Sequence, residues 1–135
     1  MKRVSSAPFP TNINGEDGDL ALKLGEAPCF VQITSPSTFG YREHATNVTS
    51  NLSKSLGGLE HMLRTEQADG YPGGAKRATE RRQILTRHLR PLALECLERG
   101  QRRGAWKLYR ATFNWHLRLG RWKYLAGFPV KALFG

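Results

Sequence analysis

The stretch QRRGAWKLYRATFNWHLRL, residues 101–119, carries the sharpest periodic pattern in the chain and decides its fold class. Mostly apolar residues recur in it at the three- and four-residue spacing of an α-helix, and a basic series repeats at similar spacing along another side. These spacings predict a strongly amphipathic helix with a basic stripe. The apolar series is Ala105, Leu108, Tyr109, Thr112, Phe113 and His116, and the basic series is Arg103, Lys107, Arg110, Asn114, Arg118 and Arg121.

Two more helices are predicted on the N-terminal side of this stretch. One runs from about Ala75 to Arg99, and Pro91 should bend or split it because proline removes a backbone donor. The segment ADGYPGG, residues 68–74, separates it from an earlier helix that Thr49 or Asn51 can cap. The apolar stripes are Leu52, Leu56, Leu59, Met62 and Leu63 in the earlier helix, and Ile84, Leu85, Leu89, Leu92, Cys96 and Leu97 in the later one.

Glycine and proline residues disturb two predicted segments, the earlier helix and the C-terminal tail. The pair Gly57-Gly58 inside the earlier helix either weakens that helix or marks close packing against a neighbour. After Gly120 the tail RWKYLAGFPVKALFG is aromatic and basic together, and Gly127 and Pro129 should interrupt any helix that it forms.

The first third of the chain has a different pattern. NGEDGDLALKLGE, residues 14–26, predicts a short helix that Asn14 can cap, with acidic residues in its first turn. CFVQIT, residues 29–34, and TFGYREH, residues 38–44, predict two short strands that complete a larger sheet, since an isolated pair is marginal in water. The expected fold is mainly α with a small β element, an α+β fold. The apolar contacts of the short helix would come from Leu20, Leu22 and Leu24.

The positive charge is confined to the second half of the chain. The whole chain has 21 Lys and Arg against 11 Asp and Glu, a net charge of +10. Up to Gly70 there are 6 Lys and Arg against 8 Asp and Glu, a net charge of −2. From Tyr71 onward there are 15 Lys and Arg against 3 Asp and Glu, a net charge of +12. The basic half therefore favours an anionic partner. The alternative, that Arg-rich helices only solvate one face, stays open.

Basic and aromatic residues interleave toward the C-terminus and form a candidate surface for a membrane or a partner. Three interpretations stay open: an anionic membrane, packing within a parent protein, and the less favoured phosphates of a nucleic acid. Two cysteines are too few for a disulfide framework, and we expect a cytoplasmic protein, or one that is peripheral at the inner membrane face. The candidate surface consists of Arg103, Lys107, Arg110, Trp115, Arg118, Arg121, Trp122 and Lys123.

Two segments outside the basic half carry candidate site residues. Glu16 and Asp17 either serve the helix dipole alone, or a carboxylate there accepts a proton from a substrate hydroxyl. His44 is either an exposed loop residue or a metal ligand, and a metal site would need further ligands from elsewhere. The sequence has no P-loop, dinucleotide fingerprint or nucleophile elbow, which excludes the enzyme classes built on those motifs.

Taken in chain order, these motifs resemble the C-terminal part of a family 2 glycosyltransferase with a GT-A fold. The matching segments are GEDGDLALKLG, ITSP, YREHATNVTSN, HMLRTE, GYPGG and AWKLYRATFNWHLRLGRWKYLAGFP, which span nearly the whole chain. The resemblance implies that Asp17 is the general base that deprotonates the acceptor hydroxyl, with Glu16 beside it. It also implies a metal or diphosphate contact from His44. Charge and position favour Arg42 as a contact to the leaving diphosphate, and we expect Asp19 to contact the substrate.

The resemblance also implies parts that this chain lacks. A complete enzyme of the family begins with a nucleotide-sugar-binding α/β half whose DxD motif holds Mg or Mn, and no such half precedes Asn14. We therefore expect a C-terminal fragment, with residues 1–47 as a remnant of the GT-A catalytic domain and residues 48–135 as a basic extension of three to four helices. Its partners in the complete enzyme would be a nucleotide-sugar and a glycan acceptor, and the chain alone should bind no metal and be inactive. The open alternative is a small basic module that binds nucleic acid or a membrane.

Overall fold

The computed structural model describes residues 9–25, 35–36 and 51–135, and the regular secondary structure in these ranges is helical. This confirms the prediction of a mainly α fold, whereas the two predicted strands, residues 29–34 and 38–44, lie outside the described ranges. The helices are α1 (Glu16–Lys23), α2 (Leu52–Gln67), α3 (Gly74–Glu98), α4 (Arg102–Arg118) and α5 (Trp122–Phe134).

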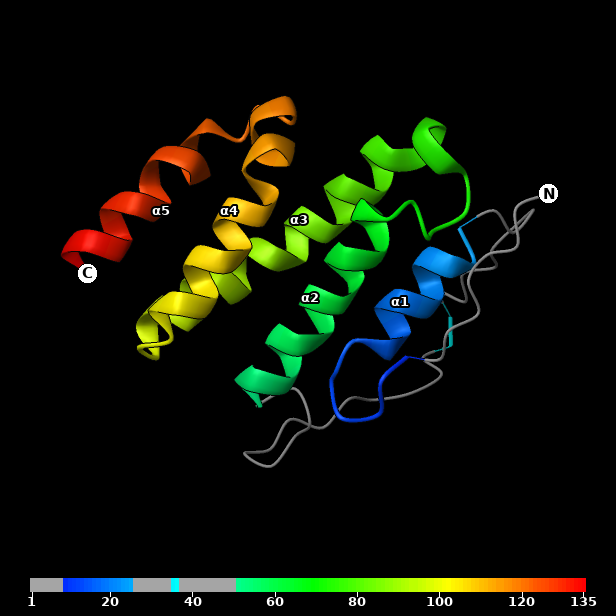
Figure 1. Cartoon of the computed structure of the whole chain (residues 1–135), viewed down its shortest axis with the longest axis horizontal. Coiled ribbons are helices and arrows are strands. Elements are labelled where there is room, and N and C mark those ends of the chain that lie inside the picture. Colours follow the sequence, from blue (N-terminus) through cyan, green and yellow to red (C-terminus); the bar gives the residue numbers. More distant parts are fainter. Residues whose placement is uncertain (1–8, 26–34, 37–50) are drawn as a thin grey trace.

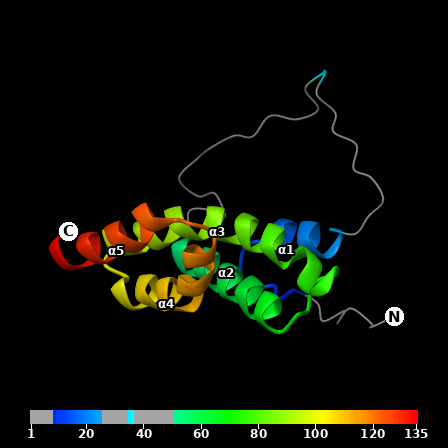
Figure 2. The ribbon, with the colours of Figure 1, turned by 90° about the horizontal axis from the view of Figure 1, so that it is seen from above.

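The longest helix, α3, lies at the centre of the bundle (Figure 1). α2 and α4 pack against it, α5 packs against both α4 and α3, and α1 lies beside α2. Seen from above, α2 and α4 lie on the same side of α3 (Figure 2). The four helices from α2 onward occupy the region for which the sequence predicts a helical extension.

Side chains of α3, α4 and α5 form the main hydrophobic core. Leu89 and Cys96 of α3 are completely buried there. Phe128 of α5 stacks on Tyr109 of α4, with ring centroids 4.5 Å apart. The predicted inner side of α4 is confirmed, because five of its six positions are buried and only Phe113 stays exposed. The amphipathic pattern thus sets which side of α4 meets the core.

α1 lies close to α2 because two glycines leave room for the preceding segment. A Cβ atom on Gly58 would overlap the backbone carbonyl of Asn14, and one on Gly57 would press on Ile13. At the same crossing the N–H of Asn14 donates to the carbonyl oxygen of Lys54 at 3.1 Å. The glycine pair therefore marks close packing, which is one of the two predicted alternatives.

The N-terminus of α2 is capped by a side chain, and the N-cap position of α1 is a glycine. The Oδ1 atom of Asn51 caps α2 by accepting a hydrogen bond from the N–H of Lys54 at 3.1 Å, as predicted. The predicted cap of α1 is wrong, because Gly15, with a φ of 111°, takes that position instead of Asn14. The carboxylate of Glu16 accepts from the N–H of Gly15 at 3.0 Å, and so satisfies a backbone donor at the start of α1.

Two predictions, about α1 and α5, are wrong, and one about α3 is narrowed to a bend. Of the three leucines expected to pack, only Leu22 is buried; Leu20 of α1 and Leu24, which follows α1, face solvent because a single side of this short helix meets its neighbours. α3 continues through Pro91 without a split, and α5 continues through Pro129. The contacts that both helices make with the rest of the bundle outweigh the local cost of proline.

A buried ion pair fixes the loop between α2 and α3. Glu66 of α2 is buried and accepts hydrogen bonds from the Nε atoms of Arg81 at 2.6 Å and Arg82 at 3.1 Å. Arg81 also donates to the carbonyl oxygens of Pro72 and Gly74 in the loop. Because breaking a buried pair leaves an uncompensated charge, this network holds the loop in one conformation.

Candidate functional site

The acidic first turn of α1 contains one buried and two exposed carboxylates. Asp19 is only 2% exposed; its Oδ1 atom accepts from the hydroxyl of Tyr71 at 2.7 Å, and its Oδ2 atom pairs with Nζ of Lys23 at 2.7 Å. Glu16 and Asp17 face solvent. The carboxylate of Asp19, for which a substrate contact is expected, is engaged in packing α1. Glu16 and Asp17 remain accessible to a ligand.

Tyr71 anchors this acidic turn to the loop between α2 and α3. Burial, together with the hydrogen bond to Asp19, raises the pKa of its hydroxyl far above the usual 10, so the group stays a donor at neutral pH. No local sequence pattern predicts this pair, because 52 residues separate its members. The first turn of α1 is thereby fixed relative to α2 and α3, with Asp17 on its outer side.

A mostly apolar hollow of about 490 Å³ lies between α1, α2 and α3, next to the acidic turn. Gly15 and Gly18, which flank Glu16 and Asp17 in sequence, form part of its wall, and His88 lines it from α3. The sequence pattern did not indicate His88, because this residue lies outside the predicted apolar stripe of α3. The exposed carboxylates of Glu16 and Asp17 do not line the hollow themselves; they lie next to its wall along the chain.

The described residues contain no group of three or more His, Cys, Asp or Glu side chains that could hold a metal ion. Asp19 is engaged by Tyr71 and Lys23, so the acidic turn has two carboxylates left. Arg42 and His44, the predicted diphosphate and metal contacts, lie outside the described ranges. We therefore derive no step through a metal ion.

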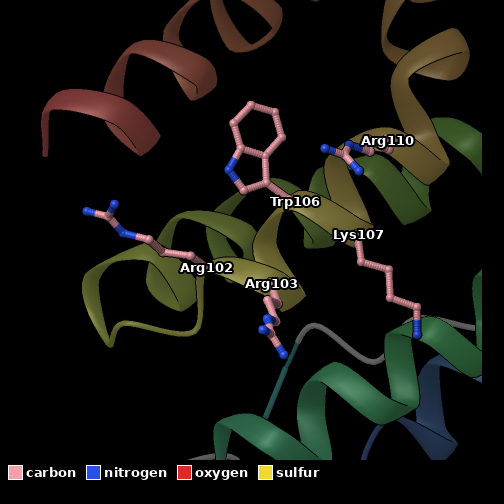
Figure 3. A pocket seen from close by; sticks show the side chains of 5 residues that line it. All are labelled: Arg102, Arg103, Trp106, Lys107 and Arg110. Atoms are coloured by element: carbon pink, nitrogen blue, oxygen red, sulfur yellow. The ribbon is translucent and has the colours of Figure 1, made fainter.

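The exposed side of α4 carries a second candidate site, which we name the basic hollow. It is an open depression of about 450 Å³ lined by Arg102, Arg103, Trp106, Lys107 and Arg110. Trp106 stands between Arg102 and Arg110, whereas Arg103 and Lys107 extend toward α2 (Figure 3). The prediction included Arg103, Lys107 and Arg110 and left out the other two, which helical spacing puts on the same exposed side.

Packing holds the indole of Trp106 in place within the basic hollow. Its ring meets Phe128 of α5 edge-on at a centroid distance of 5.3 Å, and it meets Tyr109 in the same way at 5.5 Å. The guanidinium carbon of Arg110 lies 5.6 Å from the ring centroid, within the range of a cation–π contact. The basic hollow thus has a packed aromatic residue beside its charged side chains.

Most of the charge in the basic hollow has no counter-ion among the described residues. Lys107 pairs with Glu60 of α2 at 2.7 Å. Within the part of the chain that the structure describes, no carboxylate lies within 4.0 Å of the guanidinium nitrogens of Arg102, Arg103 or Arg110. α4 and α5 themselves contain no Asp or Glu. These arginines can therefore bind an anionic group without first losing an ion pair.

The rest of the predicted surface is divided between buried and exposed positions. Trp115 is buried, and the guanidinium carbon of Arg82 lies 5.1 Å from its ring centroid, so Trp115 is a core residue and not part of an exposed surface. Its indole fills the space between α3 and α4 because the inner side of α4 includes it. The residues near the turn between α4 and α5 are the exposed Arg118, Trp122 and Lys123 and the half-buried Arg121.

Among the described helices, none is long and apolar enough to cross a membrane. No protein-family model, no curated protein and no solved structure matches the chain. The function is therefore inferred from the residues themselves and from the contacts that they make in the acidic turn and the basic hollow.

Proposed function

We propose that this chain is the acceptor-side part of an inverting family 2 glycosyltransferase, which transfers a sugar from a nucleotide-sugar to an acceptor hydroxyl in the synthesis of a cell-surface polysaccharide or another glycan. The arrangement of the acidic turn supports this function most directly. Asp19 is buried and holds α1 in place, and Asp17 is exposed and precedes Gly18, which lines a hollow that an acceptor can enter. The order of the sequence motifs supports the same function.

Asp17 acts as the general base in the proposed reaction. Its carboxylate accepts the proton of the acceptor hydroxyl while that oxygen attacks the anomeric carbon from the face opposite the leaving group. The bond between the anomeric carbon and the nucleoside diphosphate breaks, its electron pair leaves with the diphosphate, and the configuration inverts. Glu16, held by its hydrogen bond from the N–H of Gly15, lies beside Asp17 and orients the acceptor.

The proposal extends to residues outside the described ranges. Residues 29–34 and 38–44 form strands at the edge of a GT-A sheet, and residues 1–47 belong to its catalytic domain. Arg42 neutralises charge on the leaving diphosphate, and His44 contacts the diphosphate or its metal. In the complete enzyme, bound Mg or Mn supplies further charge neutralisation at that diphosphate. The enzyme acts in the cytoplasm, at the inner face of the membrane.

Sugar transfer tests this function. The longest reading frame that encodes this chain is expressed, its product is incubated with a panel of nucleotide-sugars and glycan acceptors, and proton NMR reports the anomeric configuration of the transferred sugar. We expect transfer with inversion. A product that retains the configuration of the donor, or a protein that transfers no sugar from any nucleotide-sugar in the panel, would contradict the proposal.

A further inference from the structure

We infer that α4 and α5 together form a docking surface for a membrane that contains anionic phospholipids. The phosphate groups of the lipids occupy the basic hollow, and exposed apolar residues of α5 enter the boundary between headgroups and acyl chains. This inference deepens one part of the proposed function, the position at the membrane, and rests on that part alone. Its experiments measure no sugar transfer, so the two proposals can fail separately.

The first supporting observation is the uncompensated charge on α4. Arg102, Arg103 and Arg110 surround one depression, and no described carboxylate lies within ion-pair distance of them (Figure 3). Guanidinium groups bind phosphate oxygens through charge-assisted hydrogen bonds that match the geometry of the phosphate. The basic hollow is open to solvent, which lets several headgroups approach it from one side.

The second observation is an exposed apolar surface beside this charge. Nine large hydrophobic residues are exposed among the described ones, and six of these lie on α4 and α5. Trp122, Val130 and Leu133 are 63%, 59% and 68% exposed, and helical spacing puts them on one side of α5. Contiguous exposed apolar residues of this kind mark an interaction surface. The other three residues are Phe113, Leu117 and Phe134.

The helices that carry the charged and the apolar residues are neighbours, because α5 packs against α4 (Figures 1 and 2). Phe128 joins the two helices by stacking on Tyr109 and by its edge contact with Trp106. The indole of Trp106 therefore lies between the arginines of the basic hollow and α5. Tryptophan is typical of the boundary between headgroups and acyl chains, where one part of the ring is apolar and the N–H is hydrated.

The exposed apolar residues favour a membrane over a nucleic acid as the partner. The phosphates of a nucleic acid would contact the cations and leave Val130 and Leu133 in water. A pair of interfacial helices uses both kinds of residue, since its apolar side chains leave water while its cations meet anionic headgroups. The combination on α4 and α5 therefore fits a lipid surface.

Vesicle co-sedimentation tests the docking surface with the full chain. Vesicles of phosphatidylcholine alone are compared with vesicles that also contain phosphatidylglycerol, at low and at high ionic strength. We expect binding to the anionic vesicles that weakens with salt, because the charges are solvent-exposed, and much weaker binding to the neutral vesicles. Absence of binding to both kinds of vesicle, or equal binding to both, would overturn the inference.

A pair of charge variants locates the anionic contact. Arg103→Gln/Arg110→Gln should weaken binding about 30-fold, because each basic residue near an anionic membrane strengthens binding about fivefold. The control Lys76→Gln/Arg87→Gln removes two exposed charges from α3, and it should weaken binding by about threefold at most. Equal losses in the two variants would mean that net charge alone acts, and would overturn the assignment to the basic hollow.

A pair of apolar variants tests the insertion of α5. Trp122→Ala/Leu133→Ala should weaken binding to anionic vesicles by about 10-fold or more, because two apolar side chains no longer leave water. Leu20→Ala/Leu24→Ala removes comparably exposed leucines from α1 and should leave vesicle binding unchanged. Circular dichroism confirms that each variant is folded. If the chain instead binds RNA or DNA through the arginines of the basic hollow and binds no vesicle, its partner is a nucleic acid and the inference is wrong.

Discussion

Tyr71 and Tyr124 are both buried, but only the hydroxyl of Tyr71 has a hydrogen-bond partner among the described residues. Tyr71→Phe removes the hydrogen bond to the buried carboxylate of Asp19 and should lower the free energy of unfolding by about 2 kcal/mol. Tyr124→Phe removes a hydroxyl without a partner and should be neutral or slightly stabilising. Urea unfolding of the two variants measures both effects. Equal losses would mean that the hydroxyl of Tyr71 does not anchor α1.

His116 is completely buried on α4, and neither of its ring nitrogens has a partner among the described residues. Burial, together with nearby Arg121 and Arg90, lowers the pKa of its imidazole from 6.5 to about 4. The unfolded chain thus takes up a proton at this group near pH 6.5, and the folded chain does so only near pH 4. The free energy of unfolding should therefore fall as pH decreases through this window.

His116→Phe tests that pH dependence. Phenylalanine keeps a ring against Tyr124, whose centroid lies 4.4 Å from that of the imidazole, and it removes the titrating group. Unfolding measured between pH 6.5 and about 4 should show a smaller decline for this variant than for the wild type. His88→Gln removes an exposed histidine and should keep the wild-type decline. Parallel declines of His116→Phe and the wild type would show that burial of His116 has no part in the pH dependence.

Among the helices, α4 agrees most closely with the prediction. The spacing of its apolar residues indicates directly which side of the helix is buried. The same approach failed at Pro129, where contacts with other helices outweigh a local preference, and at Pro91 it left open a split that does not occur. It identified the exposed pair of carboxylates but not the burial of Asp19 against Tyr71, since a contact between distant residues leaves no local pattern. The glycines of α2 indicated close packing without indicating their partner, Asn14.

The crossing of α1 and α2 depends on the missing side chain at Gly58. Gly58→Ala forces the backbone carbonyl of Asn14 away and should lower the free energy of unfolding by about 2–3 kcal/mol. Gly127→Ala is the matched control, because a Cβ atom there meets nothing within 4 Å; it should stabilise α5 by about 0.5–1 kcal/mol. Thermal unfolding followed by circular dichroism measures both changes. A Gly58→Ala protein as stable as the wild type would contradict this packing.

The two candidate sites, the acidic turn of α1 and the basic hollow, lie apart in the molecule. α1, with its exposed carboxylates, and the start of α4, with the basic hollow, lie toward opposite ends of the bundle in both views (Figures 1 and 2). The sequence indicated this separation through its net charges of −2 up to Gly70 and +12 beyond it. It did not indicate the basic hollow itself, because the contact of Trp106 with Phe128 depends on how α5 folds back on α4. Variants should therefore alter the proposed proton transfer and the proposed membrane docking independently.

The rate of sugar transfer by Asp17→Asn tests the proposed function most directly. The variant is made in the longest reading frame that encodes this chain, and its initial rate is compared with that of the wild type. We predict a loss of about 100- to 10,000-fold, the usual contribution of a general base. The control Asp69→Asn changes an exposed carboxylate in the loop between α2 and α3 and should keep the wild-type rate. An Asp17→Asn enzyme that transfers sugar at the wild-type rate would contradict the assignment of Asp17 as the base.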